Sequence, residues 1–123
     1  MLKVIYVGFG GFIGSVLRYF LYILTSNILG YTSPVATIFV NIIGCFLIGF
    51  AYQLFNTHLI ISENLRLFIM IGLLGGFTTF SAFSIDAFLI YQNSGKILAI
   101  AYVVLSIILS LLATLTGVWL IKS

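Results

Sequence analysis

The sequence predicts an all-α integral membrane protein with four transmembrane helices, the third of which is broken near the middle of the membrane. Composition carries the membrane assignment, because 63% of the 123 residues are hydrophobic and only 6% are charged. A soluble domain carries roughly 25% charged residues. Five basic and two acidic side chains could not cover a water-soluble globule. Soluble enzymes, nucleic-acid-binding proteins and secreted disulfide scaffolds are therefore excluded.

Four apolar runs are long enough to cross a bilayer, which takes about 20 helical residues. They cover residues 4–28, 35–55, 65–91 and 97–121. The connectors at 29–34, 56–64 and 92–96 are short and leave no room for a domain outside the membrane. We therefore expect residues 1–123 to form a single transmembrane domain.

The third run differs from the others in its small and hydroxyl residues. These are Gly72, Gly75, Gly76, Thr78, Thr79, Ser81 and Ser84. Glycine costs about 1 kcal/mol relative to alanine in a helix interior, so the pattern predicts two half-helices separated near residues 75–79. Freed carbonyl groups at such a break would suit a cation, and freed N–H groups an anion. The alternative is that the glycines only permit close helix packing.

Glycines in the first two runs are typical of close helix crossings. Gly10 and Gly14 have the G-x-x-x-G spacing, and Gly44 and Gly49 add small surfaces in the second run. We expect these positions to bring helices together, either within the chain or between two copies.

The distribution of positive charge gives almost no preferred orientation. With an even number of spans, both termini share one side of the membrane, together with Lys3, Arg66 and Lys122. The other side carries Lys96 and Arg18. Three positive charges against two give nearly no positive-inside bias. A chain of this kind can insert both ways, so an antiparallel homodimer is expected.

Two of the spans carry polar side chains that are costly in a membrane and therefore functional candidates. Asn41 in the second span offers two N–H donors, which suit an anion, and Thr37 lies one turn before it. The alternative for Asn41 is an interhelical hydrogen bond. Hydroxyl side chains recur every fourth residue in the last span, at Tyr102, Ser106, Ser110 and Thr114. They form a stripe on one helix face, unless they bond back to their own helix.

Aromatic and charged side chains complete the set of candidates. Phe80 and Phe83 share a face of the third span beside Ser81. Such rings usually pack, but a ring edge carries positive charge and can attract an anion. Arg18 either pairs with Asp86, reaches the membrane interface, or concentrates anions at a vestibule.

Three segments of the sequence resemble one family: GGFIGSVLRY at 10–19, VNIIGCFLIG at 40–49 and, most specifically, GGFTTFSAF at 75–83. On these segments the chain resembles the Fluc (CrcB) family of fluoride channels over essentially its whole length. The resemblance implies a dual-topology antiparallel homodimer in the prokaryotic inner membrane. It also implies two pores that passively export fluoride, and no enzymatic activity.

The resemblance also implies roles for individual residues. The expected fluoride-binding or pore residues are Thr37, Asn41, Phe80, Ser81, Phe83, Tyr102, Ser110 and Thr114. Arg18 is expected at the vestibule. A sodium ion at the dimer centre is expected to be held by the backbone carbonyls of Gly75 and Thr78. Fluoride, a second copy of the chain and the lipid bilayer are the expected partners, and nucleic acid is not.

Two other functions remain as alternatives from the residues themselves. A small four-helix proton-coupled multidrug exporter needs a membrane-embedded carboxylate to exchange protons for substrate. The first span has none, and Asp86 lies late in the third. A noncatalytic membrane subunit would not transport at all, and it needs neither a broken span nor aligned hydroxyls.

Overall fold

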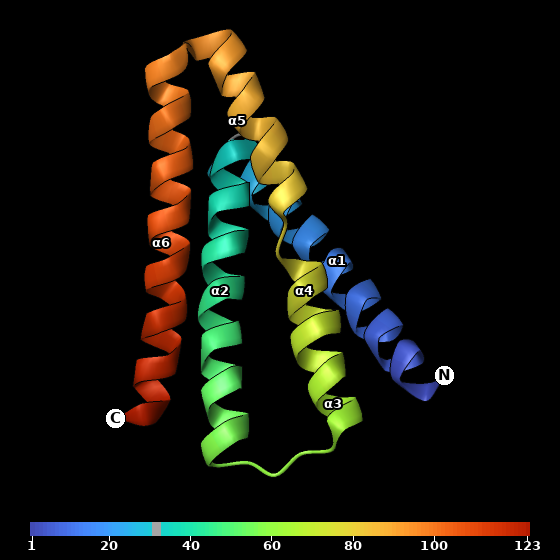
Figure 1. Ribbon diagram of the computed structural model, residues 1–123. Coiled ribbons are helices and arrows are strands. Elements are labelled where there is room, and N and C mark those ends of the chain that lie inside the picture. The colour runs from blue at the N-terminus through green and yellow to red at the C-terminus, as the bar shows by residue number, and fades with distance from the viewer. Residues whose placement is uncertain (31–32) are drawn as a thin grey trace.

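The computed structural model describes residues 1–30 and 33–123, and within them the chain is helical without strands. The elements in chain order are α1 (Leu2–Leu29), α2 (Ser33–Thr57), α3 (Glu63–Leu67), the π-helix η1 (Phe68–Leu74), α4 (Gly75–Phe77), α5 (Phe80–Ser94) and α6 (Lys96–Lys122) (Figure 1). The predicted connector at 29–34 lies only partly within this description, because residues 31 and 32 lie outside the described residues.

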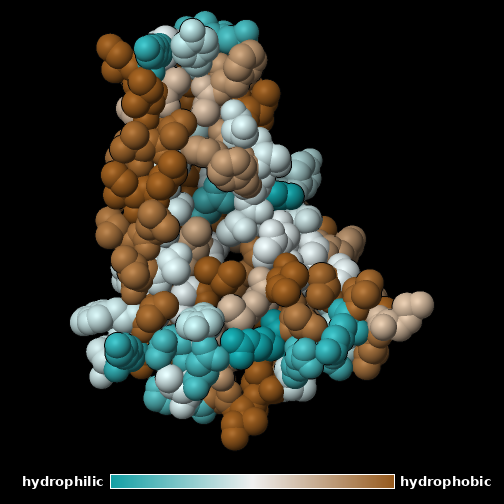
Figure 2. Space-filling model, viewed as in Figure 1, coloured by the Kyte–Doolittle hydropathy of each residue, from teal (hydrophilic) through white to brown (hydrophobic). Residues whose placement is uncertain are grey.

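Four helical segments are long and apolar enough to cross a membrane. They are Leu2–Leu29, Ser33–Thr57, Glu63–Ser94 and Lys96–Lys122, and they confirm the four predicted spans. Both termini and the α2–α3 connector lie at the same end of the bundle (Figure 1). Hydrophilic residues gather at that end and at the opposite tip, while hydrophobic residues cover α6 between them (Figure 2). The chain is therefore a multi-pass membrane protein.

The helices form two packed pairs, and the third membrane-crossing segment runs from one pair to the other. One pair is α2 with α6, and the other is α1 with η1 and α4. Beyond α4 the chain leaves α1, and α5 packs against α6 instead (Figure 1). The residues between α4 and α5 therefore lie where the chain passes from one helix pair to the other.

Glycines make the crossing of α1 with the third segment possible. A Cβ atom on Gly14 would lie 2.8 Å from the backbone nitrogen of Phe77. A Cβ atom on Gly76 would lie 2.7 Å from the backbone oxygen of Gly11. Gly10 is equally close to the backbone of η1. The predicted packing role of Gly10 and Gly14 is thus confirmed within one chain, and Gly76 packs in the same way.

Glycines also allow α2 and α6 to pack closely against each other. A Cβ atom on Gly117 would lie 2.7 Å from the backbone nitrogen of Phe50. Gly49 faces the backbone of Thr114 equally closely, as its predicted packing role requires. Gly117 was not predicted, because a lone glycine in an apolar run has no spacing signal.

The interior of the bundle holds nearly as many polar as apolar side chains. Thr37 and Val40 are fully buried, and Thr79, Asp86 and Ser106 are also buried. Large apolar side chains on all four spans are exposed instead. In lipid, such exposure has no hydrophobic cost, whereas buried polar groups must find partners. The buried polar groups are therefore the candidates for a functional site.

Candidate functional site

The backbone leaves helical geometry between α4 and α5. Thr78 (φ −79°, ψ 157°) and Thr79 (φ −149°, ψ 117°) are extended. The Thr79 hydroxyl caps α5 by accepting a hydrogen bond from the Ala82 backbone nitrogen at 3.1 Å. Asn41 of α2 holds Thr79 from the other side. Its Nδ2 donates to the Thr79 carbonyl at 3.0 Å, and its Oδ1 accepts from the Thr79 N–H at 2.8 Å.

This arrangement frees the two carbonyl groups that the family resemblance singled out. In a continuous helix the Thr79 N–H would donate to Gly75, and the Ala82 N–H would donate to Thr78. Both donors are used elsewhere, since they bond the side chains of Asn41 and Thr79. The carbonyl oxygens of Gly75 and Thr78 thereby lose their intrahelical partners.

Arg18 of α1 brings positive charge to this interruption. Its Nη1 donates to the Thr78 carbonyl oxygen at 3.4 Å, and its side chain is half-buried. No ion pair joins Arg18 to Asp86 among residues 1–30 and 33–123. Of the alternatives that the sequence left open, pairing with Asp86 is therefore not what the structure shows.

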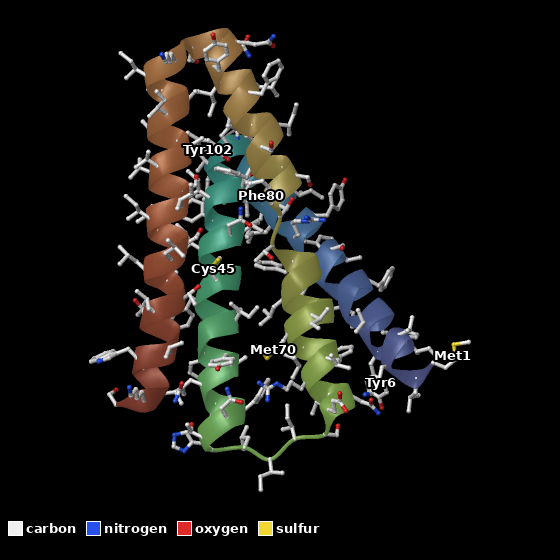
Figure 3. The ribbon with its side chains drawn as sticks, viewed as in Figure 1. Met1, Tyr6, Cys45, Met70, Phe80 and Tyr102 are labelled. Carbon is white, nitrogen blue, oxygen red and sulfur yellow. The ribbon has the colours of Figure 1, made fainter. Side chains whose placement is uncertain are left out.

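A groove of about 310 Å³ opens beside the interruption, between α2, α5 and α6. Its polar lining consists of Asn41, Thr78, Thr79, Ser106 and Ser110. Phe80 and Phe83 form its aromatic wall, with Cys45, Ile107 and Leu111 completing the lining. Figure 3 shows Phe80 at the start of α5 and Cys45 on α2, close to the passage between the helix pairs. Four of the predicted pore residues thus meet in one groove, from three helices.

Three aromatic rings form a row that begins in the groove and continues beyond it to Tyr102. The Phe80 and Phe83 ring centroids are 5.2 Å apart with the planes tilted by 50°. Phe83 in turn stacks on Tyr102 of α6, at 5.6 Å and 23°. Phe83 is buried, whereas 78% of Phe80 is exposed. The pair thus gives the groove an aromatic surface, and the edge of such a ring carries the positive charge that attracts an anion.

The hydroxyl stripe of α6 divides into groups with different partners. Ser110 and Ser106 line the groove, and the buried Ser106 Oγ has no hydrogen-bond partner within the described residues. Thr114 lies outside the groove lining, and its hydroxyl is directed at the Cys45 and Ser110 carbonyl oxygens, at 3.1 and 3.2 Å. Back-bonding, the alternative for the stripe, therefore describes Thr114 but not Ser106. The four-residue spacing placed Ser106 in the predicted hydroxyl stripe, but Ser106 was not among the predicted pore residues.

A second polar cluster, the Asp86 cluster, lies beside the groove. Three hydroxyl groups donate to the buried Asp86 carboxylate: Ser33 at 3.1 Å, Thr37 at 2.6 Å and Tyr102 at 3.4 Å. Tyr22 of α1 bonds the Thr37 hydroxyl. Thr37 and Tyr102 thus direct hydroxyl groups at a carboxylate, and their role toward fluoride stays a prediction. The sequence could not reveal this cluster, because its members come from four helices.

Two further predicted positions lie at the edge of this arrangement. Ser81 is exposed, and its hydroxyl lies 3.3 Å from that of Thr79. Gly75 is exposed as well, and a Cβ atom there would meet only the Met70 carbonyl oxygen, at 3.7 Å. Neither residue belongs to the groove lining.

Comparison with known proteins identifies relatives along the whole chain. Residues 5–118 match the family model described as CrcB-like protein, Camphor Resistance (CrcB). A protein of Elusimicrobium minutum called Fluoride-specific ion channel FluC is 45% identical over 112 residues, which is 90% of this chain and 86% of the relative. Proteins of the same name from Rhizobium meliloti and Rhizobium johnstonii are 40% and 39% identical over 123 residues, covering all of this chain and 98% of each relative. The chain therefore belongs to the CrcB family.

Proposed function

We propose that this chain is a fluoride-selective channel that lets fluoride leave the cytoplasm passively. One observation carries the proposal: relatives named as fluoride-specific ion channels match it from end to end. Hydrogen fluoride crosses membranes and dissociates at neutral pH, which traps fluoride inside the cell. A passive anion path allows the membrane potential to drive the ion out.

The chemistry of the groove supports this function. Removing the hydration of a small anion is costly, so a path must offer replacement donors. Asn41 uses one N–H of its amide nitrogen on Thr79, and that nitrogen carries a second. Ser106 and Ser110 add hydroxyl groups, and the phenylalanine pair adds ring edges. None of these groups is charged, so an ion bound among them can also leave.

The proposal includes an antiparallel homodimer with two pores and dual topology, in the prokaryotic inner membrane. The nearly balanced positive charges favour insertion in both orientations. The exposed groove on α1, lined among others by Gly8, Gly11 and Phe12, has a volume of about 590 Å³, which is enough for several side chains of a second copy. In this assembly the interruption at Thr78–Thr79 would lie at mid-membrane depth, where protein must cover its free backbone groups.

A sodium ion at the dimer centre is also part of the proposal. The carbonyl groups of Gly75 and Thr78, which lack intrahelical partners, fit it, because oxygen ligands suit a hard cation. Gly75 is exposed at the surface of the chain. The Thr78 oxygen accepts from Arg18 but has a second lone pair. The ion would supply positive charge near the pores, and its ligands would fix the two chains relative to each other.

Growth of a bacterium that lacks its own fluoride exporter tests the function. Expression of this chain should restore growth in millimolar fluoride, and the Phe83→Ile variant at equal membrane abundance should not. Failure of the wild-type chain to restore growth would contradict the proposal. Resistance to organic cations in its place would support the proton-coupled multidrug exporter.

A further inference from the structure

Asp86 presents a problem for a path that carries anions. It is a carboxylate on the same helix as the phenylalanine pair, only 3% exposed, and no cation pairs with it within the described part of the chain. Buried ionisable groups without partners are costly, and a free carboxylate would repel fluoride. The role of Asp86 must therefore follow from the hydroxyl groups that surround it.

These hydroxyl groups connect the Asp86 cluster to the aromatic wall of the groove. Both Thr37 and Tyr102 donate to Oδ2 of Asp86, and Ser33 donates to Oδ1. The ring of Tyr102 stacks on Phe83. A phenol held at its oxygen and stacked on its face has little freedom to rotate, so Phe83 packs against a fixed surface. Figure 3 shows Tyr102 on α6 near the start of α5, as this contact requires.

We infer that Asp86 is a positioning residue, which fixes the Phe83 ring through the hydroxyl group and ring of Tyr102. This inference rests on the proposed function, since the Phe83 edge matters for flux only if fluoride passes it. Asp86 acts here as a hydrogen-bond acceptor and not as a charge. Acceptor and charge are separable by mutation.

The Asp86→Asn variant separates the role of Asp86 as a hydrogen-bond acceptor from the effect of its charge. An asparagine with its oxygen in the place of Oδ2 accepts from Thr37 and Tyr102, while its NH₂ group donates to the Ser33 oxygen. A positioning role predicts fluoride efflux from liposomes within about threefold of wild type, whereas Asp86→Leu, which has no acceptor, loses about tenfold or more. Equal losses in Asp86→Asn and Asp86→Leu would overturn the inference, because the charge itself would then be required.

A double-mutant cycle tests the route through Tyr102. Tyr102→Phe keeps the stacked ring and removes the hydroxyl group. If Asp86 acts through that hydroxyl, Asp86→Leu in the Tyr102→Phe background should reduce efflux no further than the larger single loss. Losses that multiply would show two independent effects and contradict the inference.

A spectroscopic measurement keeps the inference separate from the proposed function. 4-Fluorophenylalanine at position 83 reports the surroundings of that ring by ¹⁹F NMR, whether or not the protein conducts. The resonance should stay unchanged in Asp86→Asn and should shift or broaden in Asp86→Leu. An identical resonance in both variants would overturn the inference. Absence of flux in the wild-type protein would instead overturn the proposed function. Should Asp86→Leu fail to fold, Tyr102→Phe must shift the same resonance, and an unchanged one would overturn the inference.

Discussion

Asn41 is the side chain that holds the interruption of the third segment in place. Its amide bonds both the N–H and the carbonyl group of Thr79, and it lies at the groove. An interhelical hydrogen bond and a donor for an anion were alternatives in the sequence. The geometry makes them compatible, because one amide N–H serves Thr79 and the other is left for a ligand.

The Asn41→Asp substitution tests both roles of this residue. A carboxylate cannot donate to the Thr79 carbonyl and would repel an anion in the groove. We expect fluoride efflux to fall about tenfold or more, and the free energy of unfolding to fall by about 1–3 kcal/mol. Asn93→Asp, at an exposed site near the end of α5, is the control. Undiminished efflux would remove Asn41 from the path.

The phenylalanine pair gives a second prediction at the residue scale. Phe80→Ile and Phe83→Ile keep apolar bulk but remove the aromatic edge. Each should reduce fluoride efflux about tenfold or more while the protein still elutes as the wild type does. Phe83→Ile should also cost about 1–2 kcal/mol of stability, since Phe83 is buried. Phe88→Ile, exposed on the same helix and outside the groove, should conduct normally. Unchanged flux in both test variants would contradict the role of the pair.

At the scale of elements, the α1 crossing positions the interruption. The third segment passes from α1 to α6 at Thr78–Thr79, and Arg18 of α1 reaches the Thr78 carbonyl group there. Close contact of backbones at Gly14 and Gly76 sets the distance between α1 and this segment. Any change that separates these helices also moves Arg18 away from Thr78.

Two alanine substitutions in α1 test the importance of this crossing. The new Cβ atom of Gly14→Ala would lie 2.8 Å from the Phe77 nitrogen and 3.0 Å from the Leu73 carbonyl carbon, both in backbone that cannot yield easily. We expect a loss of about 1–3 kcal/mol in unfolding experiments in detergent. Ser26→Ala, at an exposed position of α1 outside the groove proposed for a second copy, should change the stability by less than about 0.5 kcal/mol. Equal stability of the two variants would show that the crossing is looser than described.

At the scale of the whole molecule, hydropathy was enough to predict the four spans, because a helix must satisfy its backbone in lipid and needs a fixed length. The residues at which the third helix is interrupted were harder to predict from the sequence. Gly75 and Gly76 drew attention to the third run, yet both are helical, and the extended residues are Thr78 and Thr79. The position of this interruption at the middle of a bilayer stays a prediction.

Clusters made of side chains from several helices were the part of the site that was hardest to predict from the sequence. Phe80 and Phe83 share a helix face, so their pairing could be read from spacing. The partners of Asp86 come from two other helices, α2 and α6, and no spacing within one helix reveals that they meet a carboxylate on α5. Four of the ten residues that line the groove had therefore been predicted as pore residues, whereas the hydrogen bonds around Asp86 had not been predicted.

Dual topology is a prediction about the assembled molecule. A single cysteine at the C-terminus, Ser123→Cys in a Cys45→Ala background, leaves the balance of positive charges unchanged. If the chain inserts both ways, about half of these cysteines should react with an impermeant thiol reagent added outside intact cells. Complete labelling or complete protection would contradict dual topology.

Halide efflux from liposomes that contain the purified protein tests whether this chain is a fluoride-selective channel. Fluoride and chloride electrodes record release after valinomycin allows potassium to carry the compensating charge. We expect rapid fluoride efflux with negligible chloride efflux. Chloride efflux at a comparable rate, or no fluoride efflux from folded protein, would contradict a fluoride-selective channel.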